Sequence, residues 1–338
     1  MRAEKRPEMG LAGRVNWGSM ASHVMPRLVV IAGPTGVGKT AVAVALARLL
    51  PIEVISADSR QVYRGLDAAT GKPTAEERAA VAHHLIDVVD PDDRYQAARF
   101  RSDAAALVER IRARGAVPVV VGGTGLYIRA LLRGLDAAPP ADPLFRHELS
   151  ALAAREGRPA LWERLNRAAP AIATRLHPND QVRVIRALEI VRAGGGAYSE
   201  VGRWRHPGGS YDVTYFGLTM DRAALAQRLR RRAHAFVAAG LREEVRRLMA
   251  RGYSPALSSL QSIGYREFVA LEQGRLTGDE ALRRIERDTV RYAKRQWTWF
   301  AREPDIEWID VEAADGPVAV AETIARRLTP AWKQGVLA

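Results

Sequence analysis

The sequence predicts an α/β fold, a parallel sheet flanked by helices, into which a helical domain is inserted. Short runs rich in Val and Ile alternate with helical stretches in residues 26–134 and again in 213–330, a rhythm typical of a parallel sheet covered on both faces. Residues 135–212 differ, because they open on the Pro-rich break Asp136–Pro143 and then read as mostly helical.

The individual elements follow from local pattern. Short apolar runs with β-branched residues predict strands, and longer runs rich in Ala, Leu and Arg predict helices. The expected strands are Arg27–Ala32, Glu53–Ala57, a short one within His84–Val89, Ala116–Val121, Val213–Leu218 and 306–311. The expected helices are Thr40–Leu50, Phe100–Arg114, most of 143–195, 221–300 and 316–328.

The most informative segment lies between the first strand and the first helix. Residues Gly33–Thr40 read Gly-Pro-Thr-Gly-Val-Gly-Lys-Thr, which fits the phosphate-binding loop pattern G-x-x-x-x-G-K-[S/T]. In such a loop the backbone N–H groups and the helix dipole favour an anion, Lys39 adds a cation, and the Thr40 hydroxyl can hold Mg²⁺. The sequence therefore predicts a P-loop NTPase-like sheet that binds a phosphorylated small molecule, and it leaves open whether that molecule is ATP.

The ends of two further strands should meet this loop, because ligands of an open parallel sheet bind beyond the carboxyl ends of its strands. Asp58 follows the second strand. A carboxylate there can act as a general base or hold Mg²⁺ through water, and it can equally cap a turn. The run Ala116–Val121 is followed by Gly122–Thr124 and lacks the metal-binding Asp of most ATP-hydrolysing P-loop proteins, which disfavours a motor or an ATPase.

The composition excludes some classes of protein and leaves one question open. The 338 residues contain no Cys, which excludes disulfides, thiolate zinc sites and cysteine nucleophiles. The net charge of +13 suggests a polyanionic partner such as nucleic acid, yet only five of the 51 basic residues are Lys, a bias that a GC-rich genome also produces. No apolar run suits a signal peptide or a membrane span, so we expect a cytoplasmic protein with no membrane partner. Residues 1–25 are expected to be a disordered extension or the result of a misassigned start.

Three smaller patterns have both a functional and a structural interpretation. Arg228 and Arg232 share one helical face, where they can clamp an anion, although an Arg-rich solvated helix has the same spacing. The stretch Arg291–Phe300 interleaves cations with aromatic rings, as nucleic-acid-binding surfaces do, and its rings can equally pack in a core. His83 and His84 lack a third metal ligand at useful spacing and are expected to be a solvated pair.

Taken in order, eight sequence blocks resemble the bacterial tRNA dimethylallyltransferases, also called tRNA isopentenyltransferases. Any one block is weak evidence, but together they extend from about Leu28 to Arg302 in the order of that family. The blocks are Gly33–Thr40, Ser56–Tyr63, Thr70–Pro73, His84–Asp87, Val121–Tyr127, His177–Asp180 with Arg183 and Arg186–Glu189, Ile263–Arg266, and Ala293–Gln296 with Thr298–Phe300.

The resemblance implies a reaction and its components. Enzymes of this family transfer a dimethylallyl group from dimethylallyl diphosphate to the exocyclic N6 amine of adenosine 37, in tRNAs that read codons starting with U. The resemblance therefore implies that the loop holds an isoprenoid diphosphate rather than ATP, with Mg²⁺ as the cofactor. It also implies that residues 135–212 grip the tRNA anticodon stem-loop, and nothing in the sequence suggests more than a monomer.

The same resemblance assigns roles residue by residue. Asp58 is implied as the general base on the target amine, Thr35 as the hydrogen-bond donor to the bridging oxygen of the leaving diphosphate, and Arg232 as its clamp. The implied diphosphate-binding residues are Gly33, Pro34, Thr35, Gly36, Val37, Gly38, Lys39 and Thr40, with Thr40 also holding the metal ion. The implied tRNA-binding residues are Asp58, Ser59, Arg60, Gln61, Thr124, Arg146, Val182, Arg183, Val184, Ile185, Arg186, Gln261, Ser262, Ile263, Gly264, Tyr265, Arg266, Lys294, Arg295, Gln296, Trp297, Thr298, Trp299, Phe300 and Ala301.

Three other functions stay open. A small-molecule P-loop kinase would use the loop for ATP, but it needs no cationic RNA-binding surface, so the insertion at 135–212 and the stretch Arg291–Phe300 argue against it. The related adenylate isopentenyltransferases act on a free nucleotide, and the blocks implied to contact the anticodon argue against them. A non-catalytic RNA-binding protein would not need Asp58 as a base.

Overall fold

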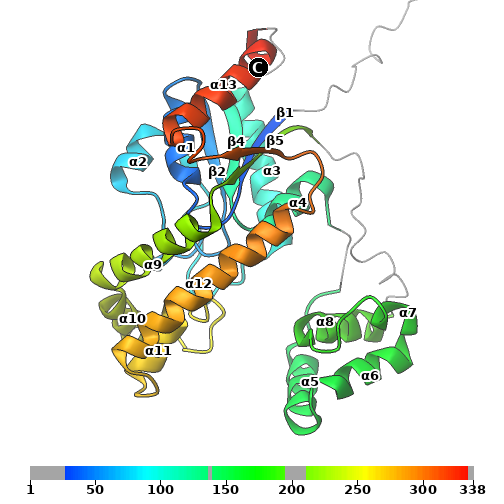
Figure 1. Ribbon diagram of the computed structural model, residues 1–338. Coiled ribbons are helices and arrows are strands. Elements are labelled where there is room, and N and C mark those ends of the chain that lie inside the picture. The colour runs from blue at the N-terminus through cyan, green and yellow to red at the C-terminus, as the bar shows by residue number, and fades with distance from the viewer. Residues whose placement is uncertain (1–26, 136–138, 195–210, 334–338) are drawn as a thin grey trace, which may run out of the picture.

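The computed structural model describes residues 27–135, 139–194 and 211–333, so the extension expected at residues 1–25 lies outside it. Its centre is a sheet of six parallel strands in the order β3-β2-β4-β1-β5-β6 (Figure 1). The strands are β1 (Arg27–Ala32), β2 (Ile52–Ala57), β3 (His83–His84), β4 (Val117–Gly122), β5 (Asp212–Thr219) and β6 (Glu307–Asp310). The predicted parallel sheet flanked by helices is confirmed.

Both faces of the sheet are buried, because alternate apolar side chains of each central strand enter different cores. In β1, Ile31 belongs to a core that α1 and α13 complete, whereas Val30 belongs to a core on the other face that includes α3 and α4. The helices nearest the sheet are α1 (Lys39–Ala47), α2 (Ala75–Ala80), α3 (Ala97–Ala113), α4 (Gly125–Arg133) and α13 (Pro317–Lys333). Of these, α2 and α4 are absent from the sequence prediction.

Local backbone geometry explains where the predicted elements were wrong. The third strand is shorter and earlier than expected within His84–Val89, because Leu85 and Asp87 adopt left-handed φ values of 61° and 57° that end it. The stretch 221–300 is not continuously helical, since Gly240, with a φ of 89°, separates its first two helices. Its four helices are α9 (Arg222–Ala238), α10 (Leu241–Ala250), α11 (Tyr265–Glu272) and α12 (Gly278–Phe300).

The segment between β4 and β5 forms a helical unit with its own core (Figure 1). Its helices are α5 (Pro143–Glu156), α6 (Arg158–Ala168), α7 (Pro170–Ala173) and α8 (Gln181–Arg192). Their shared core contains side chains such as Leu149, Leu161 and Leu188 and none from the sheet. The sheet resumes at Asp212, one residue before the boundary expected from the sequence. Within the described residues, no helix is long and apolar enough to cross a membrane.

Candidate active site

The phosphate-binding loop connects β1 to α1. Three of its glycines have positive φ values, 148° at Gly33, 82° at Gly36 and 109° at Gly38, which other residues rarely adopt. Gly36 has no room for a side chain either, because a Cβ there would lie 2.6 Å from Leu229 Cδ2 on α9. The loop brings the first N–H groups of α1, which lack acceptors within the helix, to the edge of one cavity.

Lys39, the first residue of α1, extends its side chain back over the preceding residues of the loop. Its ammonium group donates hydrogen bonds to the carbonyl oxygens of Gly33 and Pro34, at 2.9 and 2.8 Å. Burial lowers the pKa of Lys39 to about 8, an effect that the Asp58 carboxylate opposes and the Arg232 guanidinium reinforces. A bound anion raises this pKa again, so Lys39 is suited to take up a proton together with a negatively charged ligand.

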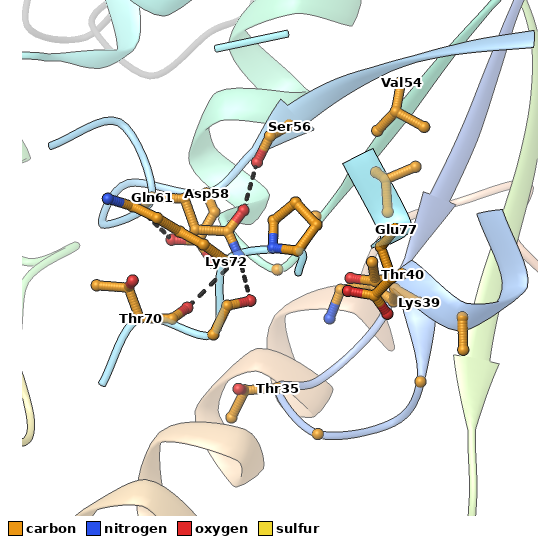
Figure 2. A pocket seen from close by; sticks show the side chains of 18 of the residues that line it. Thr35, Lys39, Thr40, Val54, Ser56, Asp58, Gln61, Thr70, Lys72 and Glu77 are labelled. Carbon is orange, nitrogen blue, oxygen red and sulfur yellow. Dashed lines mark hydrogen bonds between the residues drawn. The ribbon is translucent and has the colours of Figure 1, made fainter. Parts of the chain in front are cut away.

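Asp58 sits in the turn that follows β2. Its Oδ1 accepts hydrogen bonds from the N–H groups of Arg60 and Gln61, at 2.8 and 3.4 Å, so the residue caps this turn. The neighbouring Ser59 N–H donates to Thr124 Oγ1 at 3.1 Å, which ties the turn to the end of β4. Asp58 nevertheless lines the cavity of the phosphate-binding loop (Figure 2). Capping a turn and facing a ligand are therefore compatible roles for this carboxylate.

Arg232 on α9 turns into the site. Its Nη1 lies 3.4 Å from Thr35 Oγ1, and its guanidinium is so close to Gly71 that a Cβ there would overlap Nη2. Burial lowers the pKa of this guanidinium, which Asp58 opposes and Arg228 reinforces. The interpretation as a solvated helix face is therefore wrong for Arg232, whereas Arg228 is exposed and lines the same cavity.

Two cavities meet at these side chains. The first, of about 260 Å³, is bounded by the phosphate-binding loop, the ends of β2 and β4, and residues 70–73; in Figure 2, Lys39 and Thr40 lie on one side of it and Asp58 on the other. The second, of about 280 Å³, lies between α9, α12 and the loop before α11. Both cavities are lined by Thr35, Asp58, Thr70 and Arg232. A ligand that extends from one cavity into the other passes these four side chains.

The second cavity is partly apolar and partly cationic. Its apolar wall is formed by Leu229, Phe236, Ile263 and Ile285, and its cations are Arg60, Arg232, Arg266 and Arg295. Burial, together with the nearby Asp58 carboxylate, raises the pKa of the Tyr292 hydroxyl in this cavity to about 12, so the phenol is neutral at physiological pH. Such walls suit a ligand with a hydrocarbon part and an anionic part.

Several residues predicted to bind tRNA line cavities beside α12. In the second cavity these are Asp58, Ser59, Arg60, Gln261, Ser262, Ile263, Arg266 and Arg295. A third cavity, of about 650 Å³, is lined by Arg129, Arg183, Arg291, Lys294, Arg295, Thr298, Trp299 and Arg302. Arg129 and Arg302 received no role from the sequence, although their charge and the basic stretch on α12 are the signals that could have found them. Five of the eight residues around the third cavity are Arg and one is Lys, which suits a polyanion.

Other residues of the predicted tRNA-binding set are buried. Val184, Tyr265 and Phe300 have no exposed surface, so the predicted tRNA contact is wrong for their side chains, which pack in cores instead. The Tyr265 hydroxyl donates a hydrogen bond to the buried carboxylate of Glu244. Gln296 is also buried, and its amide contacts the phosphate-binding loop.

Residues 70–73, to which the sequence assigned no role, form one wall of the first cavity. Lys72 is 5% exposed and pairs with Asp87 and, at 2.6 Å, with Asp67. Gln61 supports the same wall, because its Nε2 donates a hydrogen bond to the Gly71 carbonyl oxygen at 2.8 Å. The block Thr70–Pro73 was the available signal in the sequence, but it identifies neither ion-pair partner of Lys72.

The two adjacent histidines are not a solvated pair, as the sequence had suggested. His84 Nε2 lies 2.6 Å from Glu53 Oε2, and His83 Nδ1 lies 2.8 Å from the Val81 carbonyl oxygen. Burial lowers the pKa of His83, whose ring lines the first cavity. The pair therefore holds β3 against β2 and closes one side of this cavity.

The oxygen-bearing side chains of the first cavity show whether it could bind the expected Mg²⁺. Within the described residues, no group of three or more His, Asp or Glu side chains could hold a metal ion. The cavity offers the Thr40 hydroxyl, with the carboxylates of Asp58 and Glu77 in its walls. This set fits Mg²⁺, which keeps several waters and takes other ligands from substrate phosphates, better than it fits a metal that needs a cage of protein ligands.

Comparison with known protein families gives two matches. The family described as IPP transferase matches residues 61–303, and the one described as Isopentenyl transferase matches residues 26–88. A tRNA dimethylallyltransferase from Anaeromyxobacter dehalogenans is 50% identical over 305 residues, which are 89% of this chain and 99% of that protein. The tRNA dimethylallyltransferase 1 of Syntrophotalea carbinolica is 48% identical over 287 residues, 84% of this chain and 91% of the relative.

Solved structures agree with these matches. The tRNA isopentenylpyrophosphate transferase from Bacillus halodurans superposes with a TM-score of 0.67 at 40% identity, covering 91% of this chain and 99% of the other. A eukaryotic dimethylallyltransferase, described as acting on tRNA, superposes with a TM-score of 0.75 at 27% identity, covering 92% of this chain and 80% of the other. The similarity thus spans the sheet and the inserted helices.

Proposed function

Because the chain belongs to the IPP transferase family, and so is a prenyltransferase, we propose that it transfers a dimethylallyl group from dimethylallyl diphosphate to the N6 amine of adenosine 37 in tRNA. The observation that carries this proposal is the junction of two cavities at Thr35, Asp58, Thr70 and Arg232. One cavity suits a diphosphate, and the other suits a hydrocarbon group beside a nucleotide. The products are isopentenyladenosine and diphosphate.

The first cavity supports departure of the diphosphate. As the allylic C–O bond breaks, its electron pair moves to the bridging oxygen, so positive charge around that oxygen lowers the barrier. Lys39 and Arg232 place such charge in this cavity. The Thr35 hydroxyl, 3.4 Å from Arg232 Nη1, is suited to donate a hydrogen bond to the bridging oxygen.

The second cavity supports attack by the amine. N6 of adenine is a poor nucleophile, so it needs a base that orients it and accepts its proton as the new N–C bond forms. Asp58 lines both cavities, which supports this role. The target base must leave the anticodon-loop stack to reach it, and the Tyr292 ring in the same cavity offers a surface for the base.

Mg²⁺ is part of the proposal. Thr40 would hold the ion together with phosphate oxygens of the substrate, and Asp58 and Glu77 would contact its water molecules. When bound, the ion neutralises charge on the leaving diphosphate.

The tRNA anticodon stem-loop is the proposed second substrate. The cations of the second and third cavities would neutralise its phosphates, and Arg183 on α8 brings the inserted helices into that surface. Arg146 forms a two-point ion pair with Glu189, at 2.6 and 2.9 Å. We therefore assign its guanidinium two roles, stabilising the inserted helices and binding RNA. One chain supplies every group named here, so a monomer suffices.

One incubation tests the function: labelled dimethylallyl diphosphate, Mg²⁺ and undermodified tRNA with the purified protein. Transfer of label to the tRNA is the expected result, and intact tRNA without label contradicts it. Strong thermal stabilisation by ATP, with none by dimethylallyl diphosphate, would instead identify a P-loop kinase. Prenylation of AMP as fast as that of an anticodon stem-loop would identify an adenylate isopentenyltransferase.

A further inference from the structure

One buried side chain joins the phosphate-binding loop to the end of β4. Gln296 lies on α12 and is 6% exposed. Its Oε1 accepts a hydrogen bond from the Thr35 N–H at 2.8 Å, and its Nε2 donates one to the Gly123 carbonyl oxygen, also at 2.8 Å. The two ends of a single amide are thus used by two loops that follow different strands.

A primary amide is the group that satisfies both loops. Thr35 offers an N–H, which needs an acceptor, and Gly123 offers a carbonyl oxygen, which needs a donor. An ionised carboxylate meets only the first need, and an apolar side chain meets neither. The approach is close, because a Cβ at Gly123 would overlap Nε2 of Gln296. The bridge therefore requires both the Gln on α12 and a residue without a side chain at position 123.

We propose that Gln296 is a positioning residue that fixes the Thr35 peptide, so that the Thr35 hydroxyl faces Arg232 and the leaving diphosphate. Gln296 borders the first cavity, but both polar atoms of its amide are engaged by the protein, so it acts through Thr35 and not by binding substrate. The inference rests on the proposed function where it concerns the reaction. The bridge itself is a property of the fold and does not depend on that function.

The neighbours of Gln296 on α12 serve a different surface. Lys294 and Thr298 line the third cavity, and Trp297 lies under the Arg222 guanidinium, 4.3 Å from ring centroid to Cζ. Because Gln296 points away from that cationic surface into the protein, its loss should change diphosphate binding and turnover but not RNA affinity. A residue of the RNA-binding surface would give the opposite pattern.

Gln296→Met tests the inference, because Met keeps the length of the side chain and removes both hydrogen bonds. We expect kcat for prenyl transfer to fall about tenfold or more and the Kd of inorganic diphosphate to rise, while the Kd of an anticodon stem-loop RNA stays within about twofold. Gln227→Met, at an exposed Gln on α9, is the matched control and should leave all three values unchanged.

A double-mutant cycle separates positioning from a general effect on folding. If Gln296 acts through Thr35, then Gln296→Met lowers kcat less than about twofold in a Thr35→Ala background. Fully multiplicative effects, or wild-type kcat and diphosphate affinity in Gln296→Met, overturn the inference. Should Gln296→Met fail to fold, Gly123→Ala displaces the same amide and must show the same non-additivity with Thr35→Ala. If the wild-type protein transfers no prenyl group, the proposed function fails, and the diphosphate affinities still decide the role of Gln296.

Discussion

The guanidinium of Arg232 and the hydroxyl of Thr35 face one another at the junction of the two cavities, with Nη1 3.4 Å from Oγ1. The residues are far apart in sequence and meet because α9 packs Leu229 directly against Gly36 of the loop. A diphosphate ester in the first cavity would place its bridging oxygen near this pair. The Thr35 hydroxyl could then donate a hydrogen bond to that oxygen, and the Arg232 guanidinium could stabilise the negative charge that develops on it.

Arg232→Ala should therefore lower kcat/KM for prenyl transfer by about 100-fold or more, because a preorganised cation at the leaving group is lost. Arg232→Lys should recover only part of this, since Lys keeps the charge without the planar fork. Arg230→Ala, on an exposed position of the same helix, is the control for net charge. Equal activity of the Arg232→Ala and Arg230→Ala proteins would show that Arg232 is no clamp.

Asp58→Asn separates the two roles of this carboxylate. The Asn side chain still offers Oδ1 to the N–H groups of Arg60 and Gln61, so the turn should keep its stability, but it cannot accept the amine proton. We expect kcat to fall by about 10²- to 10⁴-fold with the Tm and the RNA affinity unchanged. Asp58→Ala should lose the same activity and some stability as well. Retained turnover in Asp58→Asn would exclude Asp58 as the base.

Diphosphate affinity should depend on pH through Lys39. Its pKa is lowered to about 8 in the free protein, and a bound anion raises it, so binding above pH 8 must take up a proton. The affinity for inorganic diphosphate is then highest below pH 8 and falls as the pH rises through that value. Calorimetry in buffers of different ionisation enthalpy, without divalent cations, measures this uptake.

The control for the pH dependence is Lys39→Arg, whose guanidinium stays charged throughout the range. Diphosphate itself also titrates near these pH values, and this contribution is common to both proteins. The difference between them reports Lys39, and identical proton uptake by the two proteins would contradict the prediction.

Tyr265 lies in a block that the sequence assigned to tRNA, yet its buried hydroxyl donates to Glu244. Glu244 in turn accepts the Asp67 N–H at 2.9 Å and so anchors the chain that leads to residues 70–73. Tyr265→Phe should cost about 1–2 kcal/mol of stability, measured by urea unfolding, because a buried carboxylate loses a donor. RNA affinity of the folded protein should be unchanged. A selective loss of RNA binding at unchanged stability would instead show that Tyr265 contacts the tRNA.

Sequence reasoning reached the fold and the phosphate-binding loop because both follow from local signals, the period of apolar residues and a Gly-rich motif ahead of a helix. It found Asp58 because strand ends of a parallel sheet converge. It could not tell that Tyr265 and Gln296 face inward, since a block of consecutive residues on a helix alternates between surface and core. Nor could it pair Lys72 with Asp87, because ion-pair partners depend on how two loops are folded together.

The salt dependence of RNA binding should reveal the contribution of the cationic surface beside α12. Arg302 is exposed and lines the third cavity, so Arg302→Ala should weaken binding of an anticodon stem-loop and reduce the slope of log Kd against log salt concentration by about 0.7–0.9, the release of one condensed counterion. Arg326→Ala removes the same charge from an exposed position on α13, which lines no part of that cavity. Its salt slope should match the wild type, because distant charges are screened within about 8–10 Å. Equal slopes for the two variants would mean that net charge, and not this surface, holds the RNA.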